Sequence, residues 1–201
     1  MTKKPRSGAA GQIRIIGGLW RGRKLPVPDS EGLRPTTDRV RETLFNWLAA
    51  DIQQAKCLDC FAGSGALGLE ALVASCRQRH PAGAGAHGGA AAGKNLATLG
   101  AKNARVVNTN TLQFLAQKGE PHQLVFIDPP FRKGLLEQTS TLLESNGWLS
   151  DDALVYVESE VEHGLPPVPV NWQLHREKIA GQVAYRLYIR HANDKETSNV
   201  D

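Results

Sequence analysis

Residues 124–131 constrain the fold more than any other stretch, because an apolar run passes directly into Asp-Pro-Pro-Phe. The run at 124–127 is apolar without alternation, which is typical of a strand buried on both faces of a sheet. Proline cannot continue a hydrogen-bonded ladder, so the strand must end where the two prolines begin. Open α/β sheets bind their ligands at this carboxyl end. We therefore predict an α/β fold with a site at this rim, where Asp128 and Phe131 lie.

The residues at this strand end suit the activation of an amine on a nucleobase. Such an amine is a poor nucleophile because its lone pair is delocalised into the ring. The Asp128 carboxylate and the Pro129 carbonyl can accept hydrogen bonds from the amine, and Phe131 can stack on the base. The alternative is a turn that ends a strand and carries an incidental aspartate. The complete tetrapeptide after a buried strand favours the functional interpretation.

A second motif follows the predicted strand at 57–60, where a glycine-rich turn leads into a predicted helix at 67–72. Glycines allow a tight turn and a close approach to a ligand, with helix N–H groups directed at it. The spacing also fits the dinucleotide-binding pattern, so the loop alone is only moderately specific. Cys57 and Cys60 lie three apart on the strand and point to opposite faces. We therefore expect two buried cysteines and no metal site.

Basic residues gather in the first quarter of the chain. Residues 1–56 hold 11 Lys and Arg against 5 Asp and Glu, whereas residues 57–201 hold 13 against 15. This distribution predicts a phosphate-rich partner that contacts mainly the N-terminal part. An ordinary solvated tail is the alternative for the first basic residues. Trp20 lies in a predicted basic hairpin, where it can stack on RNA or pack the hairpin onto the domain.

The rest of the chain alternates between strands and helices, which indicates a doubly wound, mostly parallel sheet. Val40, Leu44, Trp47 and Leu48 have the spacing of an apolar helix face. The later strands are predicted at 105–108, 124–127, 153–157, 172–178 and 183–190, and the later helices at 111–118 and 135–143. The last two strands form a hairpin through Gly181, which makes one strand antiparallel. We expect a disordered basic tail over 1–11, a hairpin and helix over 12–50, a main domain over 51–192 and a flexible tail over 193–201.

Taken together, the motifs resemble the RsmD family of bacterial 16S rRNA guanine-N2 methyltransferases. The glycine loop and Asp-Pro-Pro-Phe follow the order found in S-adenosylmethionine-dependent amino-methyltransferases. The resemblance extends over nearly the whole chain outside residues 73–93, including the segments 14–18, 21–23, 34–42 and 44–46. It implies a Rossmann-like class I methyltransferase fold with a seven-stranded sheet and a small N-terminal basic extension. It also implies methyl transfer from S-adenosylmethionine to the N2 amine of guanine 966 in 16S rRNA, within an assembled small ribosomal subunit.

The resemblance implies roles for particular residues. Asp128, Pro129 and Phe131 would hold the guanine, with direct in-line displacement and neither metal nor covalent enzyme intermediate. The residues expected near the cofactor are Asp59, Phe61, Gly63, Ser64, Gly65 and Asn110, the last of them near the adenine. The residues expected to contact RNA are Arg14, Arg21, Arg23, Lys24, Arg39 and Arg41. For Arg39 and Arg41, the helical pattern leaves open whether they are solvent charges or face the site.

Two other functions are consistent with some of these motifs. A DNA adenine-N6 methyltransferase can use the same tetrapeptide at the strand end, but such enzymes usually need a further module to read the duplex. A catalytically impaired RNA-binding homologue is the second alternative. We expect a cytoplasmic protein, because the chain lacks an apolar run of membrane-spanning length and its basic start is not followed by a signal segment. A monomer is the default expectation for its oligomeric state.

Residues 80–93 do not fit this pattern, because Ala or Gly occupies 11 of the 14 positions. A Rossmann-like site expects a second strand here that ends in an acid for the ribose hydroxyls, yet no Asp or Glu occurs between Glu70 and Glu120. The segment is a poor strand and a poor helix, so we expect the second strand to be absent. A flexible surface loop is one interpretation of the segment.

A local frameshift is a second interpretation, because Ala, Gly, Pro and Arg all have GC-rich codons. From Arg79 onward, a reading shifted by one base permits Ala-Thr-Leu-Leu-Glu-Leu-Glu-Arg-Thr-Val-Ala-Gln-Gln-Leu-Val. That reading holds an apolar strand, an acid and an amphipathic helix, and it rejoins the chain at Lys94. It requires two compensating insertions or deletions, one near Val73 and one near Gly93.

Overall fold

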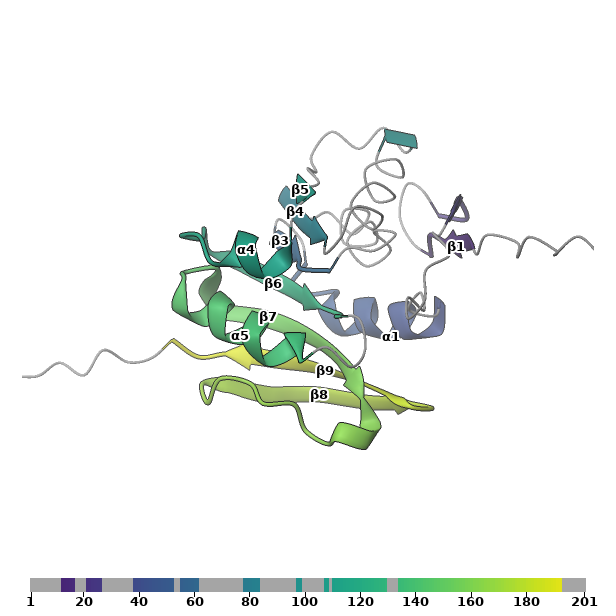
Figure 1. The fold of residues 1–201 in the computed structure, drawn as a ribbon. Helices are drawn as coiled ribbons and strands as arrows, with labels where there is room; N and C mark the ends of the chain where they lie inside the picture. Colours follow the sequence, from purple (N-terminus) through teal and green to yellow (C-terminus); the bar gives the residue numbers. More distant parts are fainter. Residues whose placement is uncertain are drawn as a thin grey trace, which may run out of the picture.

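The computed structural model contains two β-sheets with helices packed on the larger one (Figure 1). It describes residues 12–16, 21–26, 38–52, 55–61, 78–83, 97–98, 107–108, 110–129 and 134–192. The predicted tails, the glycine loop and Phe131 therefore lie outside the described residues. Among the described helices, none is long and apolar enough to cross a membrane.

The larger sheet has seven strands in the order β5-β4-β3-β6-β7-β9-β8. These strands are β3 (Lys56–Asp59), β4 (Gln78–Gly83), β5 (Val107–Asn108), β6 (His122–Ile127), β7 (Leu149–Glu160), β8 (Trp172–Ala180) and β9 (Val183–Arg190). The ladders from β5 through β7 are parallel, and β9 runs antiparallel to both of its neighbours. The predicted mostly parallel sheet with one antiparallel strand is therefore confirmed.

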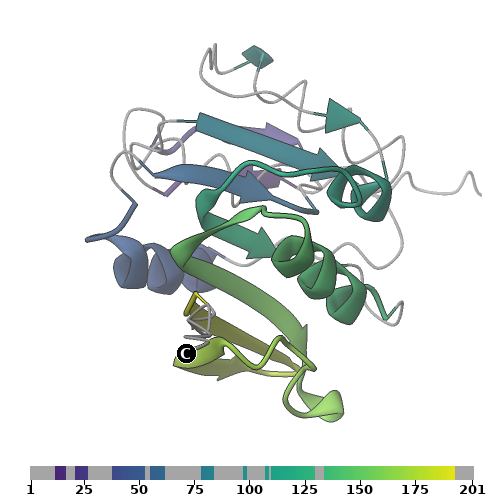
Figure 2. The ribbon, with the colours of Figure 1, turned by 90° about the vertical axis from the view of Figure 1, so that its left-hand side faces the viewer.

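Strand β6 is buried on both faces, as its unbroken apolar run predicted. Leu124 and Phe126 pack on the side of α1 (Asp38–Leu48), in the cluster that contains Leu44 and Leu48 of that helix. Val125 and Ile127 pack on the opposite side, in the cluster that contains Leu115 of α4 (Thr111–Leu115) and Leu143 of α5 (Leu135–Ser145). Figure 2 shows α1 and α5 on either side of the sheet. The alternation along one strand thus joins two hydrophobic cores.

The smaller sheet is the predicted N-terminal hairpin. Strands β1 (Gln12–Arg14) and β2 (Lys24–Pro26) pair antiparallel, and Gly22 adopts a positive φ of 84° in the connecting segment. Ile13 and Leu25 are buried, whereas their basic neighbours Arg14 and Lys24 are exposed. The hairpin therefore directs its apolar side chains inward and its cations to solvent.

A mostly buried ion pair joins α5 to the antiparallel end of the sheet. Arg190 donates from Nη2 to Oε1 of Glu144 at 2.8 Å, and Trp172 donates from Nε1 to Oε2 at 3.0 Å. Burial raises the pKa of the Glu144 carboxyl, but hydrogen bonds from Arg190, Trp172 and Asn171 outweigh this and hold the pKa below its ordinary value. Glu144 is therefore held ionised where α5, β8 and β9 meet.

Strand β8 forms one edge of the seven-stranded sheet. After the buried Trp172, every residue of β8 is exposed, and the register with β9 shifts between Leu174 and Arg176. Glu177 of this strand pairs with Arg186 of β9 at 2.5 Å. The edge is therefore irregular and charged along much of its length.

From residues 80–93 we expected the second strand to be absent, and this prediction is wrong. Strand β4 pairs in parallel with β3 through Gln78–Pro81 and with β5 through Ala82 and Gly83. The parallel sheet imposes a strand at this position even though the local sequence has little strand propensity. Pro81 lacks an N–H, and proline is normally confined to edge strands and bulges. The fold therefore places a strand where the local sequence does not favour one. The shifted reading of the frameshift hypothesis would supply a sequence that does.

Replacing residues 79–93 by the shifted reading should raise the temperature of thermal unfolding. An apolar strand without proline suits the position between β3 and β5, and 1 kcal/mol shifts the midpoint of a chain of this size by about 2–4 °C. We therefore expect a rise of at least about 3 °C, measured by calorimetry beside a control in which the same replacement residues are scrambled. Equal midpoints for the three proteins would contradict the frameshift interpretation.

Candidate functional site

The ends of β3 and β6 lie side by side and bring the predicted site residues to one edge of the sheet. Asp59, the last residue of β3, pairs with Phe126 in β6, and the backbone N–H of Cys60 donates to the Phe126 carbonyl at 3.0 Å. Asp128 and Pro129 follow β6 directly and are half-buried. Strand order reverses between β4 and β6 around β3, so this edge is the switch point where doubly wound sheets bind ligands.

Asp59 and Phe61, two of the residues that the resemblance expects near the cofactor, lie at the end of β3 and just after it. Asp59 is only 2% exposed and Phe61 is also buried. Cys60 between them is a buried free thiol, and burial, reinforced by the Asp59 charge, raises its pKa. Cys57 is buried as well, so the expectation of two buried cysteines is confirmed. Gly63, Ser64 and Gly65 lie outside the described residues.

Asn110 lies two residues after β5 and directly before α4. Its Oδ1 accepts hydrogen bonds from the backbone N–H groups of Leu112 at 2.9 Å and Gln113 at 3.3 Å, so it caps α4. The next residue, Thr111, donates its hydroxyl to the Cys60 carbonyl at 2.6 Å. Sequence reasoning missed this link, which ties the start of α4 to the end of β3. Capping uses the Asn110 oxygen, so its NH₂ group is the part that can serve a ligand.

A buried polar pair lies beside Asp128. The Tyr156 hydroxyl donates to Oε2 of Glu158 at 2.9 Å, and both side chains are buried on β7. Burial raises the pKa of Tyr156 well above its ordinary value, and the charges of Glu158 and Asp128 raise it further. Sequence reasoning missed Glu158, although it directly follows the strand predicted at 153–157; in the structure β7 extends past it to Glu160.

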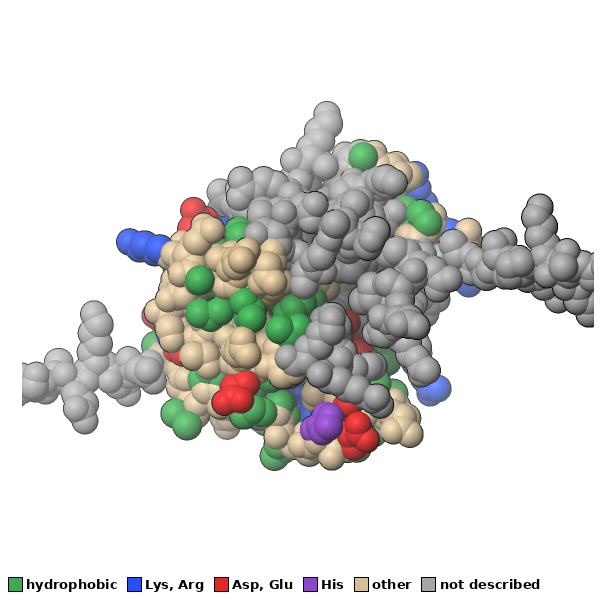
Figure 3. Space-filling model, viewed as in Figure 1, with side chains coloured by type: hydrophobic (Ala, Val, Ile, Leu, Met, Phe, Trp, Pro, Cys, Tyr) green, Lys and Arg blue, Asp and Glu red, His purple; other side chains and the backbone are tan. Residues whose placement is uncertain are grey.

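The basic residues expected to bind RNA divide into two groups. Arg14, Arg21, Arg23, Lys24 and Arg39 are exposed, and Figure 3 shows cations on the side of the molecule that carries β1. Arg23 also donates to the Thr98 carbonyl at 3.1 Å. Arg41 is fully buried, so the structure does not support it as a surface contact for RNA. Its helical position turns it into the protein, a choice that the spacing alone left open.

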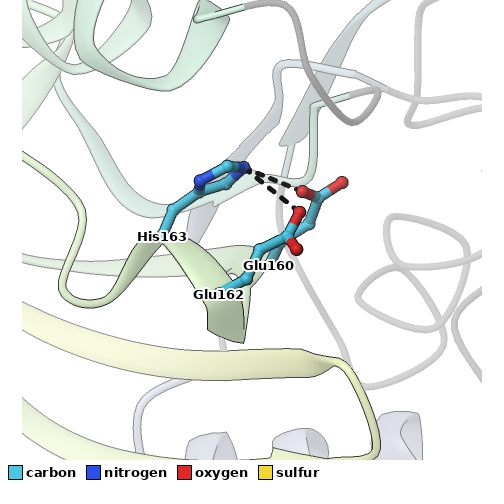
Figure 4. A group of neighbouring side chains, drawn as sticks. All are labelled: Glu160, Glu162 and His163. Atoms are coloured by element: carbon cyan, nitrogen blue, oxygen red, sulfur yellow. Dashed lines mark ion pairs between the residues drawn. The ribbon is translucent and has the colours of Figure 1, made fainter.

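One group of described residues has ligand atoms close enough to hold a metal ion. These are Glu160, Glu162 and His163, around the short helix η2 (Val161–His163) that follows β7 (Figure 4). Nε2 of His163 lies 2.9 Å from Glu160 and 3.6 Å from Glu162. Because His163 is 66% exposed and its imidazole already contacts both carboxylates, the group is explained without an ion.

Known proteins match this chain over most of its length. A family model described as Conserved hypothetical protein 95 matches residues 13–189. Ribosomal RNA small subunit methyltransferase D of Escherichia coli (strain K12) is 68% identical over 202 residues, covering 98% of this chain and 100% of the relative. The protein of that name from Haemophilus influenzae is 50% identical over 192 residues, covering 94% and 99%. A solved structure described as putative methyltransferase yhhF from Escherichia coli has a TM-score of 0.85 at 69% identity, covering 90% of this chain and 99% of that one.

The capping role of Asn110 can be separated from any ligand contact by substitution. Asn110→Ala should lower the free energy of unfolding by about 1 kcal/mol, because two helix N–H groups lose their acceptor. Asn110→Asp keeps an acceptor oxygen and should change stability by only a few tenths of that amount. Urea titration of the two variants measures both effects. Equal stability of the two variants would contradict the cap.

Proposed function

This chain belongs to the family described as Conserved hypothetical protein 95, the RsmD family, and is an rRNA methyltransferase. We propose that it transfers a methyl group from S-adenosylmethionine to the exocyclic N2 amine of a guanine, position 966 by family resemblance, in 16S rRNA. The observation that carries the proposal is the position of Asp128 and Pro129 at the end of the buried strand β6, beside the buried Asp59 at the end of β3.

The strand end at Asp128 activates the amine. Its carboxylate and the Pro129 carbonyl accept hydrogen bonds from the two amine protons, which directs the nitrogen lone pair out of conjugation. Phe131 supplies an aromatic face for the base. Bound S-adenosylmethionine supplies an electrophilic methyl group on a sulfonium. Asp128 would take the proton that the amine loses when it is methylated. Positioning supplies most of the rate.

The residues at the end of β3 suit the methionine end of the cofactor. Asp59 is held by the ladder to β6, the buried Phe61 lies two residues further on, and Gly63, Ser64 and Gly65 follow in the sequence. Asn110 is proposed to serve the adenine through its NH₂ group. The segment after β4 offers no acid for the ribose hydroxyls. We propose that the shifted reading, which supplies one, represents the functional form of this segment.

The proposed RNA contact is the N-terminal hairpin together with Arg39. Four exposed cations on the hairpin can bind phosphates, and this electrostatic contact needs no sequence recognition. We propose that the protein acts as a monomer on an assembled small ribosomal subunit in the cytoplasm, where this substrate occurs. Subunits and duplex DNA offered separately, with methyl uptake as readout, test the DNA adenine-N6 alternative, which the names of the relatives do not favour.

Asp128 is the residue on which methyl transfer should depend most. Replacing Asp128 by Asn or Ala should lower single-turnover methylation of small subunits by at least about a hundredfold, because the amine loses a charged acceptor at the moment of reaction. The matched control is Asp152→Asn, which alters an exposed carboxylate on β7. Circular dichroism should be the same for all three variants. Near-normal methylation by Asp128→Ala would contradict the catalytic role.

Neutralising the hairpin should weaken RNA binding without affecting the catalytic edge of the sheet. In the triple variant with Arg21, Arg23 and Lys24 changed to Gln, the slope of log affinity against log salt should fall by roughly one for each lost phosphate contact. A control triple variant changes three exposed cations elsewhere, Lys118, Arg176 and Lys178, to Gln. An unchanged slope in the hairpin variant alone would exclude the hairpin from the interface.

A further inference from the structure

A row of polar side chains crosses three neighbouring strands at the edge of the sheet where the base is proposed to bind. Tyr185 of β9 pairs with Glu158 of β7. Asp128 lies one residue past the pair of Ile127 with Val157, so it comes level with Glu158. The row therefore has two carboxylates at one end and a phenol at the other.

The row lies on the side of the sheet that α1 covers. Side chains alternate along a strand, so residues two apart share a face. Phe126 and Tyr156 each lie two residues before a carboxylate of the row, and both pack in the cluster on α1. Tyr185 belongs to the same cluster. Residues of α1 that extend to this edge are therefore neighbours of the row.

One line of side chains along α1 follows Tyr185 towards solvent. Arg39, Thr43 and Trp47 are spaced four apart, so they lie one above the other on the helix. Trp47 packs on the Tyr185 ring, with ring centroids 5.8 Å apart, and Thr43 shares a hydrogen bond with the Tyr185 hydroxyl. Thr43 also donates to the Arg39 carbonyl at 3.1 Å. Arg39 is thus one turn further along this line, beyond the hydroxyl.

The pKa of Tyr185 responds to charges on both sides of its hydroxyl. Burial raises this pKa, whereas the hydrogen bond with Thr43 and the positive charge of Arg39 lower it. The negative charge of Glu158 raises it, and the resulting pKa lies above the ordinary value. Arg39 and Glu158 both act on one hydroxyl, which agrees with a position of the arginine beside the carboxylates.

The position of Arg39 is not explained by the stability of the helix. Arg39 is the second residue of α1, where the positive end of the helix dipole disfavours a cation. Its side chain is exposed, and within the part of the chain that the structure describes no ion pair engages it. By contrast, Arg190 is paired with Glu144. An exposed guanidinium of this kind is suited to bind a phosphate.

The charge of an RNA substrate calls for a cation at this edge. A strand that brings its base to Asp128 also brings the phosphates on either side of that nucleotide. The two carboxylates of the row repel those phosphates. A guanidinium beside them offsets the repulsion and can hold a phosphate through two parallel hydrogen bonds. Because phosphate and base belong to one nucleotide, the same contact restricts where the base can lie.

We propose that Arg39 binds a phosphate that flanks the target guanosine, and that this contact positions the base at Asp128 and Pro129. The inference rests on the proposed function, because it requires RNA to enter at this edge. The hairpin cations hold the RNA at a distance from the reaction, whereas Arg39 acts on the reacting nucleotide. Loss of the contact should therefore slow the reaction of bound RNA as well as weaken binding.

Single-turnover methylation at saturating small subunits measures this positioning. Arg39→Gln should lower the saturated rate at least about tenfold, as expected for the loss of a charge-assisted hydrogen bond. Arg39→Lys keeps the charge but not the planar fork, so its loss should be smaller. The matched control is Arg176→Gln, which removes an exposed arginine on β8 and should leave the rate unchanged.

A neutral phosphate identifies the ligand of Arg39. Small subunits are reconstituted with 16S rRNA that carries a methylphosphonate on the 5′ or the 3′ side of the target guanosine, beside a 2′-deoxy nucleotide that prevents strand cleavage. The control rRNA has the same deoxy nucleotide with an ordinary phosphate. At one of the two positions, the unaltered chain should lose at least about tenfold in saturated rate. Arg39→Gln should be insensitive to that replacement, because the two changes remove the same contact.

The outcomes have different meanings. An unchanged rate in Arg39→Gln, or no effect of either neutral phosphate on the unaltered chain, would overturn the contact while leaving guanine methylation intact. Equal losses on neutral phosphate with and without Arg39 would also overturn it.

Two further measurements keep the test specific. A fall in the affinity of Arg39→Gln for S-adenosylmethionine, measured by calorimetry, would overturn the proposal, because the guanidinium would then serve the cofactor carboxylate. Thermal melting checks that each variant is folded, and the comparison of neutral with ordinary phosphate on the unaltered chain does not depend on any variant. If the unaltered chain transfers no methyl group to ordinary subunits, the proposed function fails, and the contact fails with it.

Discussion

The parallel pairing of β3 with β6 is the interaction on which the site depends. Its ladder runs from Cys57 with Leu124 to Asp59 with Phe126, and the Cys60 N–H extends it by one hydrogen bond. Both strands are central and buried, so their ends cannot move independently. Thr111 adds the start of α4 to the same point through the Cys60 carbonyl. The proposed cofactor side and the proposed base side are therefore held in a fixed relation by backbone hydrogen bonds, without a side chain having to bridge them.

Much of this arrangement could be predicted because its signals are local. The unbroken apolar run of 124–127 specifies a strand buried on both faces, and two prolines mark its end. Gly181 between two alternating strands specifies the hairpin that makes β9 antiparallel, and its φ is 60°. The apolar spacing of α1 specifies the face that packs on β6. In each case the sequence within one element contains the physical reason for its structure.

The features that were missed depend on contacts between distant segments. Strand β4 has Pro81 and little strand propensity, yet parallel neighbours on both sides impose it. Arg39 and Arg41 are both arginines on α1, so residue type does not distinguish them. Only the packing of α1 decides that Arg41 is buried and Arg39 is exposed. Glu158 and Asp128 are thirty positions apart in the sequence. They come close only because β6 and β7 pair in parallel.

Strand β8 has a consequence for how the protein behaves in a crowded cell. An exposed edge strand offers a row of backbone donors and acceptors to which another chain can add, and this is a common route to aggregation. The shift in register after Leu174 breaks that row, and the neighbouring charges of Arg176, Glu177 and Lys178 disfavour an apolar partner strand. The sheet is thus protected against growth at this edge, and copies of the chain can accumulate beside their large RNA substrate without joining sheet to sheet.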